Sequence, residues 1–145
     1  MGGLKEKITG KKVYFDTNIF IYLYEGNSSL SARISELQLL IESSEIQVIS
    51  SDLIYAEMLP PLVRQGNKKA LQNLFDFLGE SEAFDILPIT RDISVYAGVL
   101  RGETGLKTPD AIHIASAKSS ECDVFLTNDK NIKIPEDIEM VIFSD

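Results

Sequence analysis

Acidic residues directly follow two short apolar stretches that have the composition of buried strands. Asp16 follows Val13-Tyr14-Phe15, and Asp129 lies just past Val124-Phe125-Leu126-Thr127. Parallel strands end at one edge of their sheet, which is where such sheets bind ligands, so these two carboxylates can face one another there. Taken singly, each has a simpler interpretation. Asp16 would cap the next helix, and Asp129 would belong to a turn.

Two further acids lie on expected helices. Asp110 follows Thr108-Pro109, a Thr cap and a Pro at the first helical position, so its carboxylate would lie in the positive first turn. Glu57 lies on a largely apolar helical stretch, where a carboxylate needs a partner or a metal. The structural alternatives are that Asp110 only complements the helix dipole and that Glu57 faces solvent or pairs with Arg64.

Together these acids predict a site for a hard metal ion. Three or four carboxylates with a single histidine, His113, suit Mg²⁺ or Mn²⁺, and no Cys/His spacing supports zinc. His113 itself fits a packed or partner-bonded histidine better than a catalytic base. Because a carboxylate-held Mg²⁺ typically meets substrate phosphates, the expected substrate carries phosphate.

The elements that must position these acids alternate between strand and helix. Strands are expected at residues 12–15, 46–50, 84–87, 124–127 and 140–143, with helical spacing of apolar residues between them. This alternation predicts a three-layer α/β/α domain with a central parallel sheet of four to five strands. The helical stretch from Ser51 to Met58 is expected to end or kink at Pro60-Pro61.

Composition narrows the class of protein. The 145 residues are expected to form one domain, residues 1–145, and the lone Cys122 allows no internal disulfide. The longest apolar run, Ile19 to Tyr24, is far short of the ~20 residues that span a bilayer, so we expect a cytoplasmic protein without a membrane segment. The net charge of −8 disfavours direct contact with nucleic acid, whereas bound divalent cations would place positive charge where a phosphate must sit.

Four segments, taken in order and spacing, resemble the PIN domain family, and within it the ribonuclease toxins of VapBC toxin–antitoxin pairs. They are Tyr14-Phe15-Asp16-Thr17-Asn18, Ser50-Ser51 through Ala56-Glu57, Thr108-Pro109-Asp110-Ala111-Ile112-His113-Ile114-Ala115, and Phe125-Leu126-Thr127-Asn128-Asp129. The resemblance covers nearly the whole chain. It implies Mg²⁺- or Mn²⁺-dependent endonucleolytic hydrolysis of single-stranded RNA.

The resemblance also implies roles for individual residues and partners. The catalytic and metal-binding acids would be Asp16, Glu57, Asp110 and Asp129, and the substrate-binding polar residues would be Thr17, Asn18, Thr127 and Asn128. A homodimer is implied, together with a small antitoxin protein whose tail would enter the acidic pocket. The basic residues suited to RNA backbone contact are Arg64, Lys68, Lys69, Arg101, Lys107 and the amino-terminal Lys5, Lys7, Lys11 and Lys12.

Two other functions are compatible with an acid that follows a buried strand. One is a catalytically silent PIN-like module that binds metal or a partner protein without turnover. The other is a haloacid-dehalogenase-like phosphatase, whose nucleophile motif needs a second acid two positions later. Asn18 occupies that position, so the phosphatase ranks below the nuclease.

Overall fold

A parallel sheet forms the centre of the molecule. The structure is a computed structural model that describes residues 3–79 and 82–145. Within them the strands are β1 (Lys12–Phe15), β2 (Gln47–Ser51), β3 (Phe84–Leu87), β4 (Val124–Thr127) and β5 (Glu139–Ile142). They form a five-stranded sheet in the order β3-β2-β1-β4-β5, with every neighbouring pair parallel. The predicted parallel sheet is confirmed, and each expected strand lies within one residue of its observed position.

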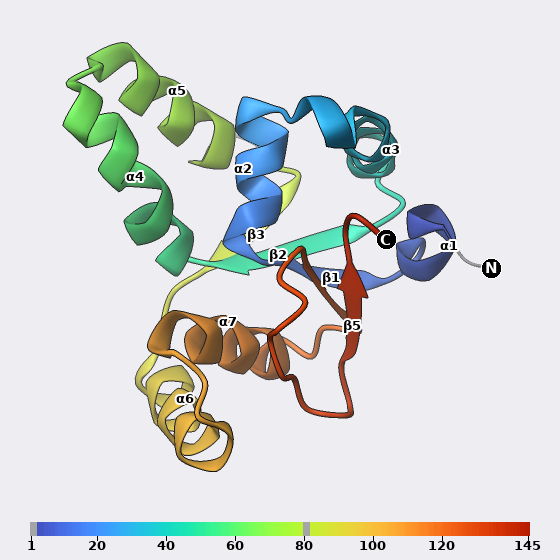
Figure 1. The fold of residues 1–145 in the computed structure, drawn as a ribbon, viewed down its shortest axis with the longest axis vertical. Coiled ribbons are helices and arrows are strands. Elements are labelled where there is room, and N and C mark those ends of the chain that lie inside the picture. The colour runs from blue at the N-terminus through green and yellow to red at the C-terminus, as the bar shows by residue number, and fades with distance from the viewer. Residues whose placement is uncertain (1–2, 80–81) are drawn as a thin grey trace.

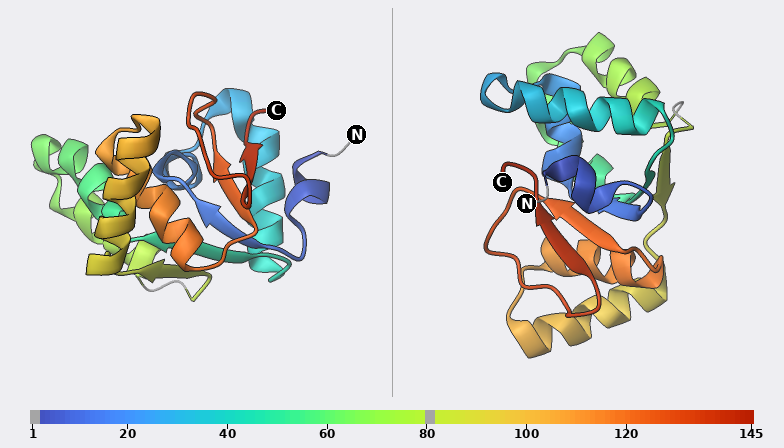
Figure 2. Two further views of the ribbon diagram at one scale, coloured as in Figure 1. Left: turned by 90° about the horizontal axis from the view of Figure 1, so that it is seen from below. Right: turned by 90° about the vertical axis from the view of Figure 1, so that its right-hand side faces the viewer.

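Helices cover both faces of this sheet (Figure 1). In chain order they are α1 (Leu4–Ile8), α2 (Thr17–Glu25), the 3-10 turn η1 (Ser28–Leu30), α3 (Ser31–Glu42), α4 (Leu53–Gln65), α5 (Lys68–Gly79), α6 (Arg91–Thr104) and α7 (Thr108–Ser119). Figure 2 shows α6 and α7 packed together on one face, with α2 and α3 on the other. The predicted three-layer α/β/α arrangement is therefore confirmed.

Alternation along β1 divides the core into two parts. Val13 and Phe15 point to the face covered by α1 to α5, whereas Tyr14 points to the face covered by α6 and α7. All three side chains are fully buried, as expected for a central strand covered on both faces. This alternation places Tyr14 beside the face of α7 that carries His113.

Two expected helix ends are not observed, although the alternative that α4 kinks at Pro60-Pro61 stays a prediction. The helix after β2 does not end at Pro60-Pro61 but continues to Gln65. Each proline removes one amide donor, and the residues on that side, including Ala56 and Pro60, are exposed, so water can satisfy the freed carbonyls. Helix α7, which contains Asp110, begins one residue earlier than expected. Thr108 is its first residue, and Lys107 occupies the cap position without a side-chain hydrogen bond.

The described residues contain no helix that is both long enough and apolar enough to cross a membrane.

Candidate active site

The connections of the sheet create a crevice beside β1. The chain passes from β1 to β2 on one side, while β4 pairs with β1 on the other. Ligands of open α/β sheets bind beyond the carboxyl ends of the strands at such a switch in strand order. Asp16 follows β1 directly and Asp129 follows β4 by two residues, so both acids lie at this crevice. The predicted proximity of the two strand ends is confirmed.

Asp16 is held by hydrogen bonds to both of its carboxylate oxygens. As the cap of α2, it accepts the backbone N–H of Thr17 at Oδ1 (2.8 Å), and it accepts the Thr127 hydroxyl at Oδ2 (2.7 Å). The side chain is almost fully buried. Capping a helix and facing the crevice are therefore compatible roles for this carboxylate, because each uses a different lone pair.

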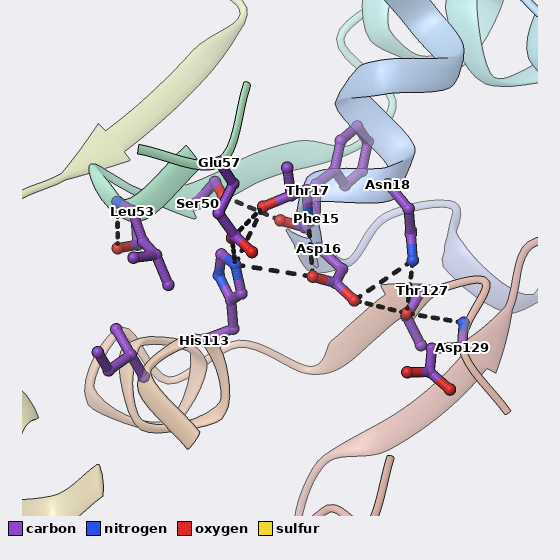
Figure 3. Close-up of polar contacts among 12 residues, drawn as sticks. Phe15, Asp16, Thr17, Asn18, Ser50, Leu53, Glu57, His113, Thr127 and Asp129 are labelled. Carbon is purple, nitrogen blue, oxygen red and sulfur yellow. Dashed lines mark hydrogen bonds and ion pairs between the residues drawn. The ribbon is translucent and has the colours of Figure 1, made fainter. Parts of the chain in front are cut away.

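Glu57 joins a partly buried polar network to which the four elements α4, α7, α2 and β1 contribute, and its contacts with Thr17 and His113 are drawn in Figure 3. His113 Nε2 lies 2.7 Å from Glu57 Oε1, and the Thr17 hydroxyl donates to the same oxygen at 2.7 Å. On its other side, His113 Nδ1 lies 2.7 Å from the hydroxyl oxygen of Tyr14. The network thus extends from β1 through α7 to α4.

The chemistry of the carboxylate assigns the protons in this network. Burial acts to raise the pKa of Glu57, but hydrogen bonds from His113 and Thr17 outweigh it and hold the pKa below its ordinary value. Glu57 is therefore ionised at neutral pH and can only accept, so His113 Nε2 carries a proton. With a proton on Nε2, the ring can accept a hydrogen bond from the Tyr14 hydroxyl at Nδ1. His113 is a partner-bonded histidine, as the sequence predicts, but its partner is one of the candidate acids.

The other three candidate carboxylates influence the pKa of Asp110. Burial is the main cause that raises its pKa, and repulsion from Asp16, Asp129 and Glu57 raises it further, with partial compensation by His113. This electrostatic coupling brings the four sequence-predicted acids into one environment. An acidic environment of this kind favours either a proton or a cation.

The four carboxylates nevertheless do not converge on one point. Asp129 Oδ1 accepts the backbone N–H of Asn131 at 2.9 Å, and its carboxylate points away from Asp16 (Figure 3). Within residues 3–79 and 82–145, no group of three or more Asp, Glu, His or Cys side chains is arranged to hold a metal ion. The donor chemistry still fits a hard divalent cation, because the donors are all oxygens and their mutual repulsion raises the pKa of Asp110.

The four polar residues that were predicted to bind substrate mainly form hydrogen bonds within the protein. Thr127 is fully buried, and its hydroxyl also accepts the backbone N–H of Asp129 (3.1 Å). The side-chain oxygen Oδ1 of Asn18 accepts a hydrogen bond from the backbone N–H of Asn128 at 3.2 Å. The Asn128 side chain binds the Tyr22 hydroxyl and the Ser144 backbone. These contacts position the carboxylates and the loop after β4, and direct binding of substrate by Thr17, Asn18, Thr127 and Asn128 stays a prediction.

Tyr14 is the residue of the network that the sequence did not single out. Its phenol is buried against His113 and the ring of Phe125, and burial raises the pKa of its hydroxyl far above the ordinary value. The signal was present in the sequence, because strand alternation places Tyr14 opposite Val13 and Phe15. His113 likewise lies one helical turn after Asp110 and shares its face.

Comparison with known proteins shows what the chain resembles. The model of a family described as the PIN domain matches residues 13–136. No curated protein matches the sequence significantly. Similar solved structures include a toxin–antitoxin complex from Klebsiella pneumoniae, with 24% identity, a TM-score of 0.65 and coverage of 91% of this chain and 98% of that chain. VapBC2 from Rickettsia felis, bound to a DNA fragment from the promoter, has 18% identity and a TM-score of 0.68, with coverage of 90% and 97%. At these identities the two structures show a shared fold.

Proposed function

The chain belongs to the PIN domain family, and from that premise we propose that it is a Mg²⁺- or Mn²⁺-dependent endoribonuclease that hydrolyses single-stranded RNA. PIN domains are generally nucleases. The observation that carries the proposal is the placement of the acids: Asp16 and Glu57 lie 3.7 and 2.7 Å from the same atom, His113 Nε2, and Asp16 and Asp129 follow the adjacent strands β1 and β4. Burial, and then repulsion by the other three carboxylates, raises the pKa of Asp110. Such a set repels an RNA phosphate unless a cation neutralises it, which is the requirement of a metal-dependent phosphodiesterase.

The residues that would hold the ion are Asp16, Glu57, Asp110 and Asp129. When bound, Mg²⁺ or Mn²⁺ supplies positive charge at the scissile phosphate and lowers the pKa of a water. The protein orients these acids. Thr127 holds Asp16, while His113 and Thr17 saturate Glu57 Oε1 and leave Oε2 as its free acceptor. Asp110, at the start of α7, and Asp129, after β4, would complete the set of oxygen ligands.

The biological setting is part of the same proposal. The chain shares its fold with chains of a toxin–antitoxin complex and of VapBC2. On that basis we infer a VapC-like toxin, residues 1–145 as one domain, that works in the cytoplasm as a homodimer and is restrained by a small antitoxin protein.

The direct test incubates the purified protein with labelled single-stranded RNA in Mn²⁺ or Mg²⁺, with and without a chelator. Asp16→Asn and Asp110→Asn should each abolish cleavage, as should the chelator. Asp92→Asn is a matched control, because Asp92 lies in the first turn of α6 as Asp110 lies in the first turn of α7. Cleavage that survives the chelator and both substitutions would contradict the proposal.

One observation counts against turnover and so favours a second candidate function, a silent module whose acids bind a partner protein or, without an assembled catalytic site, a metal ion. The acids of the described residues are not assembled into a metal site. Under this alternative, Mn²⁺ would bind and stabilise the protein, but no RNA would be cleaved. Thermal unfolding with and without Mn²⁺, measured beside the cleavage assay, separates the two functions.

A further inference from the structure

An open cleft borders two of the candidate metal ligands. It has a volume of about 380 Å³ and is lined by the turn between α6 and α7 and by the loop between β4 and β5. Asp110 and Asp129 form part of its wall, and Lys107 and Lys133 form another part. Its volume falls within the range of roughly 300–1,000 Å³ that is typical of small-ligand sites.

Local hydrogen bonds give both walls of the cleft a defined shape. Gly105, at φ +75°, ends α6 in the left-handed conformation, and Arg101 Nε donates to the Leu106 carbonyl at 3.2 Å. These contacts place Lys107 directly before α7. On the opposite wall, the turn closed by Asn131 N–H on Asp129 Oδ1 leads the chain towards Lys133. The two lysines are 26 positions apart in the sequence, and only the fold brings them to one cleft.

The two lysines are available to an anionic ligand. Although carboxylates line the same cleft, neither Lys107 nor Lys133 forms an ion pair with any residue that the structure describes. In contrast, Lys11, Lys118 and Lys130 are paired with Glu139, Asp137 and Asp145. The chain has a net charge of −8 and therefore repels a polyanion such as RNA. Two unpaired lysines beside the acidic crevice reduce this electrostatic repulsion where the RNA strand would bind.

We propose that this cleft binds a backbone phosphate of the RNA strand, adjacent to the phosphate that is hydrolysed, through Lys107 and Lys133. This proposal rests on the proposed ribonuclease function and adds the path of the substrate strand. The phosphate would be bound as a point charge without sequence readout, because ammonium groups contact phosphate oxygens and carry no base information. The uncapped amino terminus of α7, next to Lys107, adds positive potential to the same wall.

The experiment compares Lys107→Ala/Lys133→Ala with the wild type in two measurements. The first is the salt dependence of binding to labelled single-stranded RNA in Ca²⁺, an oxygen-preferring ion that can neutralise the acids in place of Mg²⁺ or Mn²⁺, with gel analysis to show that the RNA stays intact. Loss of two phosphate contacts should make the negative slope of log K (the binding constant) against log salt concentration shallower by about 1.4. The second is steady-state cleavage with Mn²⁺, in which KM should rise roughly tenfold at moderate salt with kcat unchanged.

Two control variants make the result specific. Lys118→Ala/Lys130→Ala removes the same charge from two ion-paired lysines that do not line the cleft and should leave KM and the slope at wild-type values. Lys107→Arg/Lys133→Arg retains both charges and should restore them. Lys107, Lys133 and Lys130 are exposed and Lys118 is partly exposed, and circular dichroism should show that each alanine variant is folded.

The outcomes separate the cleft from the proposed function. If the wild type cleaves RNA and the Lys107→Ala/Lys133→Ala variant keeps its KM and slope, the cleft proposal fails and the ribonuclease stands. If the wild type cleaves no RNA in Mn²⁺ or Mg²⁺, the ribonuclease proposal fails, whereas the slope measured in Ca²⁺ still tests the cleft. An unchanged RNA slope together with weaker binding of an antitoxin would assign the lysines to a protein partner and overturn the cleft proposal.

Discussion

His113 Nε2 lies 2.7 Å from Glu57 Oε1, so the only histidine of the chain is bonded to one of its four candidate metal ligands. His113 is buried, whereas about a third of the Glu57 side chain is exposed (33%). A rigid, buried imidazole therefore fixes one oxygen of a carboxylate whose other oxygen faces the crevice. Pre-organisation of this kind orients metal ligands before the ion arrives.

Substitution of His113 should weaken metal binding through Glu57. In His113→Ala the Nε2 donor is lost, so the pKa of Glu57 should rise and the Mn²⁺ affinity should fall roughly 10–100-fold. His113→Gln can present an amide donor to Glu57 and should recover part of this loss. Carboxyl NMR titration of Glu57 and calorimetric Mn²⁺ binding measure the two effects. Equal Mn²⁺ affinity in wild type and His113→Ala would exclude a positioning role.

Removal of the Tyr14 hydroxyl should destabilise the fold. Tyr14→Phe leaves His113 Nδ1 buried without its partner, which costs about 1–3 kcal/mol of the unfolding free energy. Tyr24→Phe is the matched control, because its hydroxyl donates a longer bond of 3.2 Å to the Ala70 carbonyl at a partly buried site. Urea unfolding should show the larger loss for Tyr14→Phe. A larger loss for Tyr24→Phe would contradict the buried network.

Replacement of Asp110 by Asn should stabilise the metal-free protein while abolishing cleavage. Burial and repulsion raise the folded-state pKa of Asp110, so its ionised form destabilises the fold as pH rises through that pKa. The gain from Asp110→Asn, below about 1 kcal/mol after solvent screening, should appear at about pH 7 and vanish at about pH 3. Thermal melts at both pH values, in a chelator, test this. A lower melting temperature of the variant at neutral pH would be the contrary result.

Glu57→Gln should show the opposite pH dependence. Hydrogen bonds hold the folded-state pKa of Glu57 below its ordinary value, so ionised Glu57 stabilises the fold above that value. This stabilisation is lost as pH falls through the lowered pKa. Glu57→Gln should therefore be less stable than the wild type at about pH 7, and the two should converge in acid. A constant difference in unfolding free energy across this range would show that the ionisation of Glu57 is not involved.

Mn²⁺ should raise the thermal stability of the wild type. An ion that binds only the folded state adds about 2.7 kcal/mol at a hundred times its Kd. The shift in melting temperature should disappear in Asp16→Asn and persist in Asp92→Asn, whose acid lies at the start of α6. A shift of equal size in Asp16→Asn would place the ion elsewhere.

The sequence by itself determined the elements and the set of acids. Short β-branched and aromatic runs separated by helical spacing were sufficient to predict the parallel sheet, because these patterns are local and repeat along the chain. The same local reading selected Asp16 and Asp129, which follow strands, and Asp110, which begins a helix. It allowed α4 to end at Pro60-Pro61, but α4 continues to Gln65, because exposure of that side lets water replace two backbone hydrogen bonds.

Only the tertiary structure decided which groups bind these acids. Tyr14, His113 and Glu57 are 43 or more residues apart in pairs, and Lys107 and Lys133, 26 positions apart, line one cleft. Such contacts depend on the crossing of strands and helices, which periodicity along one segment does not encode. The physical reason is that a side chain's own sequence neighbourhood fixes the direction in which it points, whereas the partner that it meets is fixed by how the layers pack.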